Sequence, residues 1–174
     1  MRRFLFTSIL VFFATSMFSQ LALARWYTIE EAEKLNATHP KKFIIDVYTD
    51  WCGWCKKMDK ETFTHPVIIQ YLNDNFYAVK LNAEQTAPIT FGGKTFKTPN
   101  NGERSTNELA QVLLNGQLSY PTVAFLSERL ELIGPAPGYK DPKSMEALLV
   151  YVKDELYKTQ KFDDFMATFK GKIK

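Results

Sequence analysis

The only two cysteines of this 174-residue chain lie close together, in the stretch Trp51-Cys-Gly-Trp-Cys-Lys56. Residues 42–48, just before it, are almost continuously apolar and rich in branched and aromatic types, which predicts a strand buried on both faces. Helical sequence follows from Gly53 to Phe63. The cysteine pair therefore lies where a buried strand meets the start of a helix, and the sequence predicts a sheet with helices packed against it.

The rest of the sequence predicts further strands and helices within one domain. With 45% hydrophobic and 14% aromatic residues, the chain can bury a core. Capping-box spacing at 28–31 and 105–108 marks two helix starts, and Gly92-Gly93 between two alternating runs predicts a tight hairpin. A strand-helix-strand crossover followed by an antiparallel pair implies a mixed sheet with helices on both faces. The expected elements are a helix at 28–37, a strand at 42–48, helices at 53–63 and 67–72, a strand at 76–81, a hairpin at 89–96, a helix at 105–116, strands at 120–126 and 130–133, and a helix from Asp141 to Leu156 with an amphipathic tail from Lys161.

The first 24 residues have the pattern of a secretory signal peptide. A basic start, Met1-Arg-Arg3, precedes the apolar run 4–18 and an Ala-Leu-Ala cleavage site at 22–24. The apolar run is shorter than the roughly 20 residues that a membrane-spanning helix needs. We therefore expect a domain of residues 25–174 that is exported, most simply to the periplasm or else secreted, with no stable membrane insertion after the signal is removed. Removal lowers the formal net charge of +3 by two, so we expect no nucleic-acid partner.

The position of the cysteines predicts redox chemistry. A helix start offers free N–H groups and a partial positive charge, which stabilise a thiolate. We expect the pKa of Cys52 to lie well below the value of about 8.5 of a free thiol, and Cys55 to resolve a mixed disulfide formed on Cys52. Two alternatives are a structural disulfide, which would close too short a loop to stabilise the fold much, and a zinc site. A zinc site needs four ligands, and the only histidines, His39 and His65, lack the paired spacing of a zinc finger.

The stretch from Asp46 to Lys56 resembles the active-site segment of thioredoxin. The resemblance covers about residues 41–155 and includes Val79-Lys-Leu-Asn82, Tyr120-Pro-Thr122 at the place of the family's cis-proline loop, and Gly138-Tyr139. It implies the thioredoxin-like three-layer α/β/α sandwich with a central mixed sheet. Against that fold, residues from about 86 to 103, hairpin included, are an insertion. Surface decoration is the default expectation for this insertion, and a partner-binding flap is the alternative.

The resemblance also implies roles for individual residues at the redox site. Cys52 is the attacking nucleophile, Cys55 is the resolving thiol, and Trp51 shields the pair. Asp46, six residues before Cys52, matches a buried acid that relays a proton, and Lys80 matches the lysine that modulates this acid. Burial should raise the pKa of Asp46 toward neutral pH. A buried ion pair with a structural role alone is the other interpretation of the acid and the lysine.

A set of neighbouring residues is assigned to substrate binding by the same resemblance. Pro121 in the cis form would lie against the sulfurs and present the backbone of Tyr120 to an extended substrate segment, whereas an ordinary strand-edge proline is the alternative. Tyr120 is larger than the residue usual at its position and could narrow substrate choice. Trp54 stands where thioredoxin has proline, so the direction of electron flow stays open. The assigned set is Trp51, Gly53, Trp54, Tyr120 and Pro121.

The sequence predicts an enzyme, a thiol-disulfide oxidoreductase that exchanges disulfides with exported proteins and acts as a reductant. Its partners would be disulfide-bearing or dithiol proteins and a separate electron donor or acceptor. We expect no cofactor and no metal beyond the redox-active pair Cys52 and Cys55. The alternative function is a thiol-based metal-binding or client-escort module on the same fold.

Overall fold

The computed structural model describes residues 23–100 and 104–174. The predicted signal peptide, residues 1–24, lies outside the described residues except for its last two positions. Within the described ranges, no helix has the length and apolar character needed to cross a membrane.

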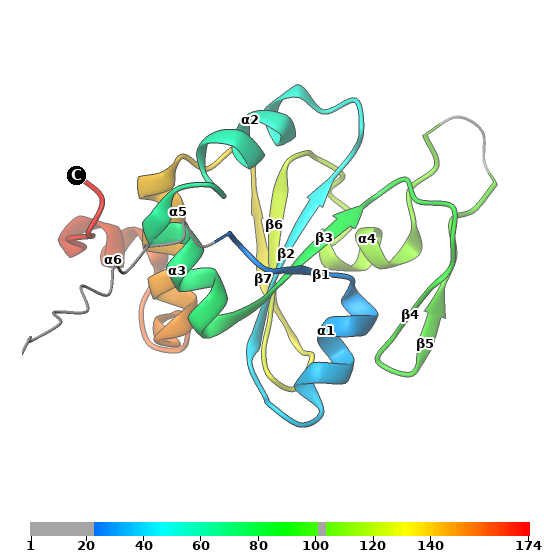
Figure 1. Ribbon diagram of the computed structural model, residues 1–174, viewed down its shortest axis with the longest axis horizontal. Helices are drawn as coiled ribbons and strands as arrows, with labels where there is room; N and C mark the ends of the chain where they lie inside the picture. The colour runs from blue at the N-terminus through cyan, green and yellow to red at the C-terminus, as the bar shows by residue number, and fades with distance from the viewer. Residues whose placement is uncertain (1–22, 101–103) are drawn as a thin grey trace, which may run out of the picture.

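A five-stranded mixed sheet forms the centre of the domain (Figure 1). The three strands on one side run parallel to each other, and the remaining two are antiparallel to their neighbours. This architecture confirms the predicted α/β class with a central mixed sheet. The strands in spatial order are β1 (Trp26–Tyr27), β3 (Phe76–Asn82), β2 (Lys42–Tyr48), β6 (Thr122–Leu126) and β7 (Leu132–Pro137).

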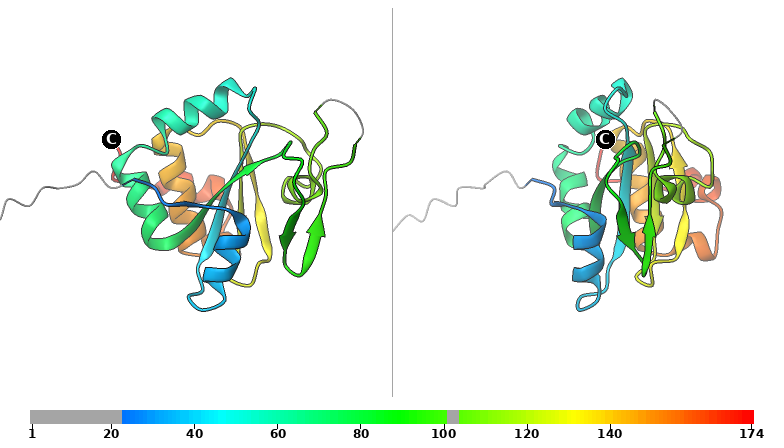
Figure 2. Two further views of the ribbon diagram at one scale, coloured as in Figure 1. Left: turned by 45° about the vertical axis from the view of Figure 1, so that its right-hand side comes forward. Right: turned by 90° about the vertical axis from the view of Figure 1, so that its right-hand side faces the viewer.

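Helices cover both faces of this sheet, as Figures 1 and 2 show. The buried strand β2 divides the core, because Phe43, Ile45 and Val47 join one apolar cluster and Ile44 joins the other. The first cluster includes α1 and α4, and the second includes α3 and α5, so the three-layer sandwich is confirmed. The helices are α1 (Ile29–Asn36), α2 (Gly53–Glu61), α3 (Pro66–Asn75), α4 (Glu108–Leu113), α5 (Pro142–Lys153), the short η1 (Leu156–Lys158) and α6 (Phe162–Thr168).

The predicted hairpin is present as a separate two-stranded sheet. Its strands are β4 (Ile89–Phe91) and β5 (Lys94–Phe96). Gly92 and Gly93 between them have φ angles of 59° and 72°, a left-handed conformation that glycine adopts without steric cost.

The hairpin packs into the core, so the expectation of surface decoration for residues 86–103 is wrong for this part of the insertion. Ile89 and Phe91 are buried in the first apolar cluster, where the Phe91 ring lies 6.3 Å from that of Phe43. A backbone N–H in the turn donates to the Glu33 carboxylate of α1 at 3.0 Å. Burial of two large side chains fixes the position of the hairpin against α1.

Element boundaries near the insertion differ from the prediction. The capping box of Thr28 and Glu31 is confirmed, but α4 begins later than the second capping pattern predicted. Its N-cap is Asn107, which is buried and accepts the Leu109 N–H at 2.9 Å. The Glu108 carboxylate instead accepts a backbone N–H from the insertion. The N-cap of α4 is therefore the fully buried amide side chain of Asn107, and not the predicted Ser105.

Two further elements differ toward the C-terminus. The last strand spans residues 132–137 instead of 130–133, because Leu130 adopts a left-handed turn with a φ angle of 64°. The helix α5 ends at Lys153, and Glu155 is also left-handed, so the predicted amphipathic tail folds back as separate short helices. The strand β1 is an addition to the predicted elements.

Candidate active site

The cysteine pair lies at the start of α2, at the end of the sheet where β2 leads into this helix (Figure 1). Cys52 is the N-cap residue, and its Sγ accepts the backbone N–H of Cys55 at 3.1 Å. The two sulfurs form a disulfide with an S–S distance of 2.05 Å. Both cysteines are buried, with 4% and 2% of their surface exposed. A thiolate on Cys52 would receive the free N–H groups of the helix start and its partial positive charge.

Aromatic side chains surround the buried disulfide. Trp51 and Trp54 are 52% and 57% exposed, and each packs against a tyrosine from another loop. Trp51 meets Tyr120 edge to face, with the ring centroids 6.0 Å apart. Trp54 lies 5.4 Å from Tyr139, and the Lys57 ammonium lies over both of these rings. Exposed apolar surface therefore flanks the otherwise buried sulfurs on two sides.

The Tyr120–Pro121 peptide bond is cis, as the resemblance implied. Thr122, the next residue, pairs with Val47 in the antiparallel ladder between β6 and β2. This register places Pro121 beside the end of β2 that leads to the cysteines. The Pro121 carbonyl accepts the Gly138 N–H at 2.8 Å, which ties the loop to the end of β7.

Asp46 is fully buried in the middle of β2 and contacts Lys80 of the neighbouring strand β3. The Lys80 ammonium donates to Asp46 Oδ2 at 2.6 Å, whereas Oδ1 has no hydrogen-bond partner among the described residues. Desolvation by burial raises the pKa of Asp46 from 3.8 to about 6, although the Lys80 charge acts in the opposite direction. Asp46 shares a face of β2 with Ile44, on the side where Met58 of α2 packs. Asp46 therefore lies beneath α2, and its carboxyl group can gain or lose a proton near neutral pH.

Lys80 has a second carboxylate partner, Asp59, which was not predicted from the sequence. Its ammonium also bonds to the half-exposed carboxylate of Asp59 in α2. Burial lowers the pKa of Lys80, but Asp46 and Asp59 outweigh this effect and the pKa is raised above 10.5. Lys80 therefore stays charged and connects a fully buried acid to one that reaches solvent. The sequence does contain a signal for Asp59. It lies four residues after Cys55, a helical spacing that places both residues on the same face of the helix.

Three aromatic rings enclose the Lys80 ammonium. Trp26 of β1, Tyr48 of β2 and Phe63 lie with their centroids 4.8, 5.4 and 5.2 Å from Nζ. Cation–π attraction to these rings favours the charged lysine. Trp26 was also absent from the predicted site, because its strand is only two residues long.

The remaining candidate ligands lie outside this site. His65 is the N-cap of α3 and accepts the Val67 N–H at 3.3 Å. His39 contacts Thr38 at the end of α1. Within residues 23–100 and 104–174, no cluster of three or more His, Cys, Asp or Glu side chains is arranged to hold a metal ion.

Comparison with known proteins agrees with this geometry. A family model described as a thioredoxin-like domain matches residues 29–153, which include the cysteine pair, Asp46, Lys80 and Pro121. The chain belongs to the thioredoxin-like domain family. Over 53 residues it is 43% identical to the thiol:disulfide interchange protein DsbD of Haemophilus ducreyi, a match that covers 30% of this chain and 9% of that protein.

Solved structures show the same thioredoxin-like fold at low sequence identity. A thioredoxin-fold protein from Helicobacter pylori superposes with a TM-score of 0.56 and 19% identity, over 86% of this chain and 84% of that chain. A thioredoxin from Thermus thermophilus gives a TM-score of 0.55 and 19% identity, over 75% and 87% of the two chains. The predicted thioredoxin fold is therefore confirmed. The thioredoxin-like domain and its Cys-x-x-Cys disulfide support thiol-disulfide oxidoreductase activity.

Proposed function

We propose that the protein is an exported thiol-disulfide oxidoreductase that reduces disulfides in other exported proteins. The observation that carries the proposal is the position of Cys52, whose sulfur is both the N-cap acceptor of α2 and a partner in the disulfide with Cys55. A helix start lowers the pKa of a thiol and so supplies the thiolate that attacks disulfides. The exposed aromatic residues Trp51 and Trp54, together with Tyr120 and cis-Pro121, would contact the client.

The first step consumes a client disulfide. With the pair in its dithiol form, the Cys52 thiolate attacks one client sulfur and forms a mixed disulfide. The other client sulfur leaves as a thiolate and takes a proton from solvent. Gly53 is the first residue of α2, and a side chain at this position would meet nothing within 4 Å, so the surface next to Cys52 is open to the client.

The second step releases the client. Asp46, ionised above its pKa of about 6, accepts the proton of the Cys55 thiol, and the resulting thiolate attacks Cys52 Sγ. The intramolecular disulfide forms again, and the second client sulfur leaves as a thiolate that takes a proton from solvent. Lys80 and Asp59 provide the connection from the buried acid toward solvent. Two electrons have passed to the client, so an exported or membrane-bound dithiol donor must reduce the pair again.

Export and the direction of transfer rest on separate observations. The sequence of residues 1–24 and the similarity to thiol:disulfide interchange proteins support an exported, periplasmic protein. The buried Asp46 and its partner Lys80 match the proton-handling pair of reducing thioredoxins, which favours a reductant. The match covers only 9% of the thiol:disulfide interchange protein DsbD. The client and the electron donor of the present protein are therefore part of the proposal.

Turnover of a protein disulfide tests the proposal. The protein should accelerate reduction of the insulin interchain disulfides by dithiothreitol, and Cys52→Ser should remove the acceleration. Metal analysis of the same preparation distinguishes the metal-binding or client-escort alternative. Acceleration that survives Cys52→Ser, or no acceleration together with copper or zinc bound in equimolar amount, would overturn the proposal.

A further inference from the structure

The insertion returns to the catalytic end of the domain on a well-anchored segment. The Thr98 hydroxyl donates to the carbonyl of Gln85, and the Asn107 side chain donates to Thr98 Oγ1 at 3.1 Å. The Glu108 N–H donates to the Lys97 carbonyl at 3.0 Å, and the Lys97 N–H donates back to the Glu108 carboxylate at 2.9 Å. These bonds hold the segment after the hairpin against the end of β3 and the start of α4.

This anchored segment brings Arg104 onto the tryptophan that precedes the nucleophile. The Arg104 guanidinium lies 5.0 Å from the centroid of the Trp51 ring. The indole N–H of Trp51 points to the Glu84 carboxylate, 3.0 Å from each oxygen, and Tyr120 contacts the same ring edge to face. Three groups from three segments therefore fix the Trp51 indole as a wall beside Cys52.

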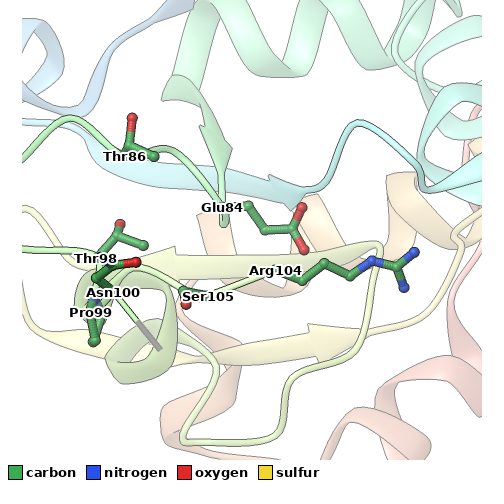
Figure 3. Close-up of a pocket in the computed structure, with 7 residues that line it drawn as sticks. All are labelled: Glu84, Thr86, Thr98, Pro99, Asn100, Arg104 and Ser105. Atoms are coloured by element: carbon green, nitrogen blue, oxygen red, sulfur yellow. The ribbon is translucent and has the colours of Figure 1, made fainter. Parts of the chain in front are cut away.

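A cavity of about 440 Å³ lies between the end of β3 and the insertion, and two of its lining residues, Glu84 and Arg104, contact Trp51 (Figure 3). Thr98 and Asn100 line one end of it, and Glu84 and Arg104 line the other. Figure 3 shows the side chains of Glu84 and Arg104 extending to the same side, away from Thr98 and Asn100. Polar groups thus line a space large enough for a client side chain, beside two of the residues that hold the Trp51 indole.

Arg104 stacks on Trp51 through the face of its guanidinium. Across the described residues, no carboxylate forms an ion pair with Arg104, whereas the Glu84 carboxylate accepts the indole N–H. Stacking on an indole leaves the edge of a guanidinium free, and its five donors match a carboxylate in a bidentate arrangement. The edge of the Arg104 guanidinium therefore provides a site for an anionic group beside Trp51, the residue that precedes Cys52.

We propose that Arg104 recognises an acidic side chain near the reactive cysteine of the client. The preferred clients are disulfide-bearing protein segments with Asp or Glu within a few residues of the attacked cysteine. This inference rests on the proposed function, because it names the clients of the same cysteine pair. It gives the segment that follows the insertion a role in substrate choice, in addition to the packing of the hairpin against α1.

The expected preference is small but measurable. Ion pairs at exposed positions change an equilibrium by up to about fivefold, and salt screens them. Three disulfide-linked peptides that differ only in Glu, Gln or Lys next to the cysteine serve as probes. We expect the unmodified protein to reduce the Glu peptide with a kcat/KM about threefold above that for the Lys peptide at low salt. The ratio should fall toward one as ionic strength rises.

Charge substitutions at Arg104 make the test decisive. Arg104→Gln should bring the ratio of the Glu to the Lys peptide close to one, and Arg104→Glu should invert it. Arg129→Gln is the matched control, since the Arg129 side chain is 84% exposed at the turn between β6 and β7, and it should leave the ratio unchanged. A ratio of one in the unmodified protein, or a preference that survives Arg104→Gln, would overturn the inference while turnover continues. Failure to reduce any of the three peptides would overturn the proposed function together with it.

Discussion

Substitution of Asp46 by Asn gives the sharpest test of the buried acid. Burial raises the pKa of Asp46 from 3.8 to about 6, a difference of about two units, and each unit corresponds to 1.36 kcal/mol. The ionised carboxylate therefore lowers the free energy of unfolding by about 3 kcal/mol above about pH 7, whereas below about pH 3 the group is protonated in both states and this contribution vanishes. Asn is neutral throughout. The stability gained by Asp46→Asn should therefore increase by about 3 kcal/mol between about pH 3 and pH 8.

Denaturant unfolding of the oxidised protein and the variant, at a series of pH values, measures this difference. Asp59→Asn is the matched control, because it also removes one carboxylate from Lys80 but leaves the buried acid in place. The control should retain most of the pH dependence of the unmodified protein. Asp46→Asn should also slow disulfide exchange near pH 7, because Cys55 loses its proton acceptor.

Two results would refute this reasoning. Parallel stability profiles for the protein and Asp46→Asn between about pH 3 and pH 8 would show that the buried acid does not titrate in this window. An unchanged exchange rate together with lowered stability would assign Asp46 and Lys80 the role of a structural ion pair.

Four further substitutions test other parts of the structure. Cys55→Ser should accumulate mixed disulfides with client proteins, visible on non-reducing gels, whereas Cys52→Ser should accumulate none; the opposite result would reverse their roles. Glu146→Ala leaves two backbone N–H groups of the C-terminal segment without the carboxylate that they bond at 2.7 and 2.9 Å, so we expect a loss of about 1–3 kcal/mol and faster tryptic cleavage of that segment. Unaltered cleavage would mean that this contact does not hold the C-terminus. Asn107→Ala removes the N-cap of α4 and should lower the free energy of unfolding by about 1 kcal/mol, and an unchanged denaturation midpoint would contradict this.

Several elements were predictable because their signals are local. The apolar run of β2 and the capping box of Thr28 and Glu31 each specify an element through neighbouring residues, and the structure confirms both. The cis bond before Pro121 followed from the resemblance to thioredoxin, since an X–Pro bond alone favours trans.

The rest of the site depends on contacts between distant segments. Trp26 lies in a strand too short to have a periodic pattern, and it reaches Lys80 only through the pairing of β1 with β3. Arg104 meets Trp51 because hydrogen bonds of Thr98 and Asn107 anchor the chain on both sides of it, and local sequence does not reveal these bonds. Asp59 is the exception, because helical spacing from Cys55 would have placed it near the redox pair.

The reduction potential of the Cys52–Cys55 pair tests the central claim most directly. The protein is equilibrated with glutathione buffers of graded ratio, and the fraction of dithiol is read by thiol alkylation and mass spectrometry. A reductant requires a potential near that of thioredoxin, about −270 mV, and a pair that is largely dithiol in cells with an intact electron donor. A potential near −120 mV, which is roughly the value of strong oxidants, with the pair held as a disulfide in cells, would contradict the account and make the protein a disulfide donor.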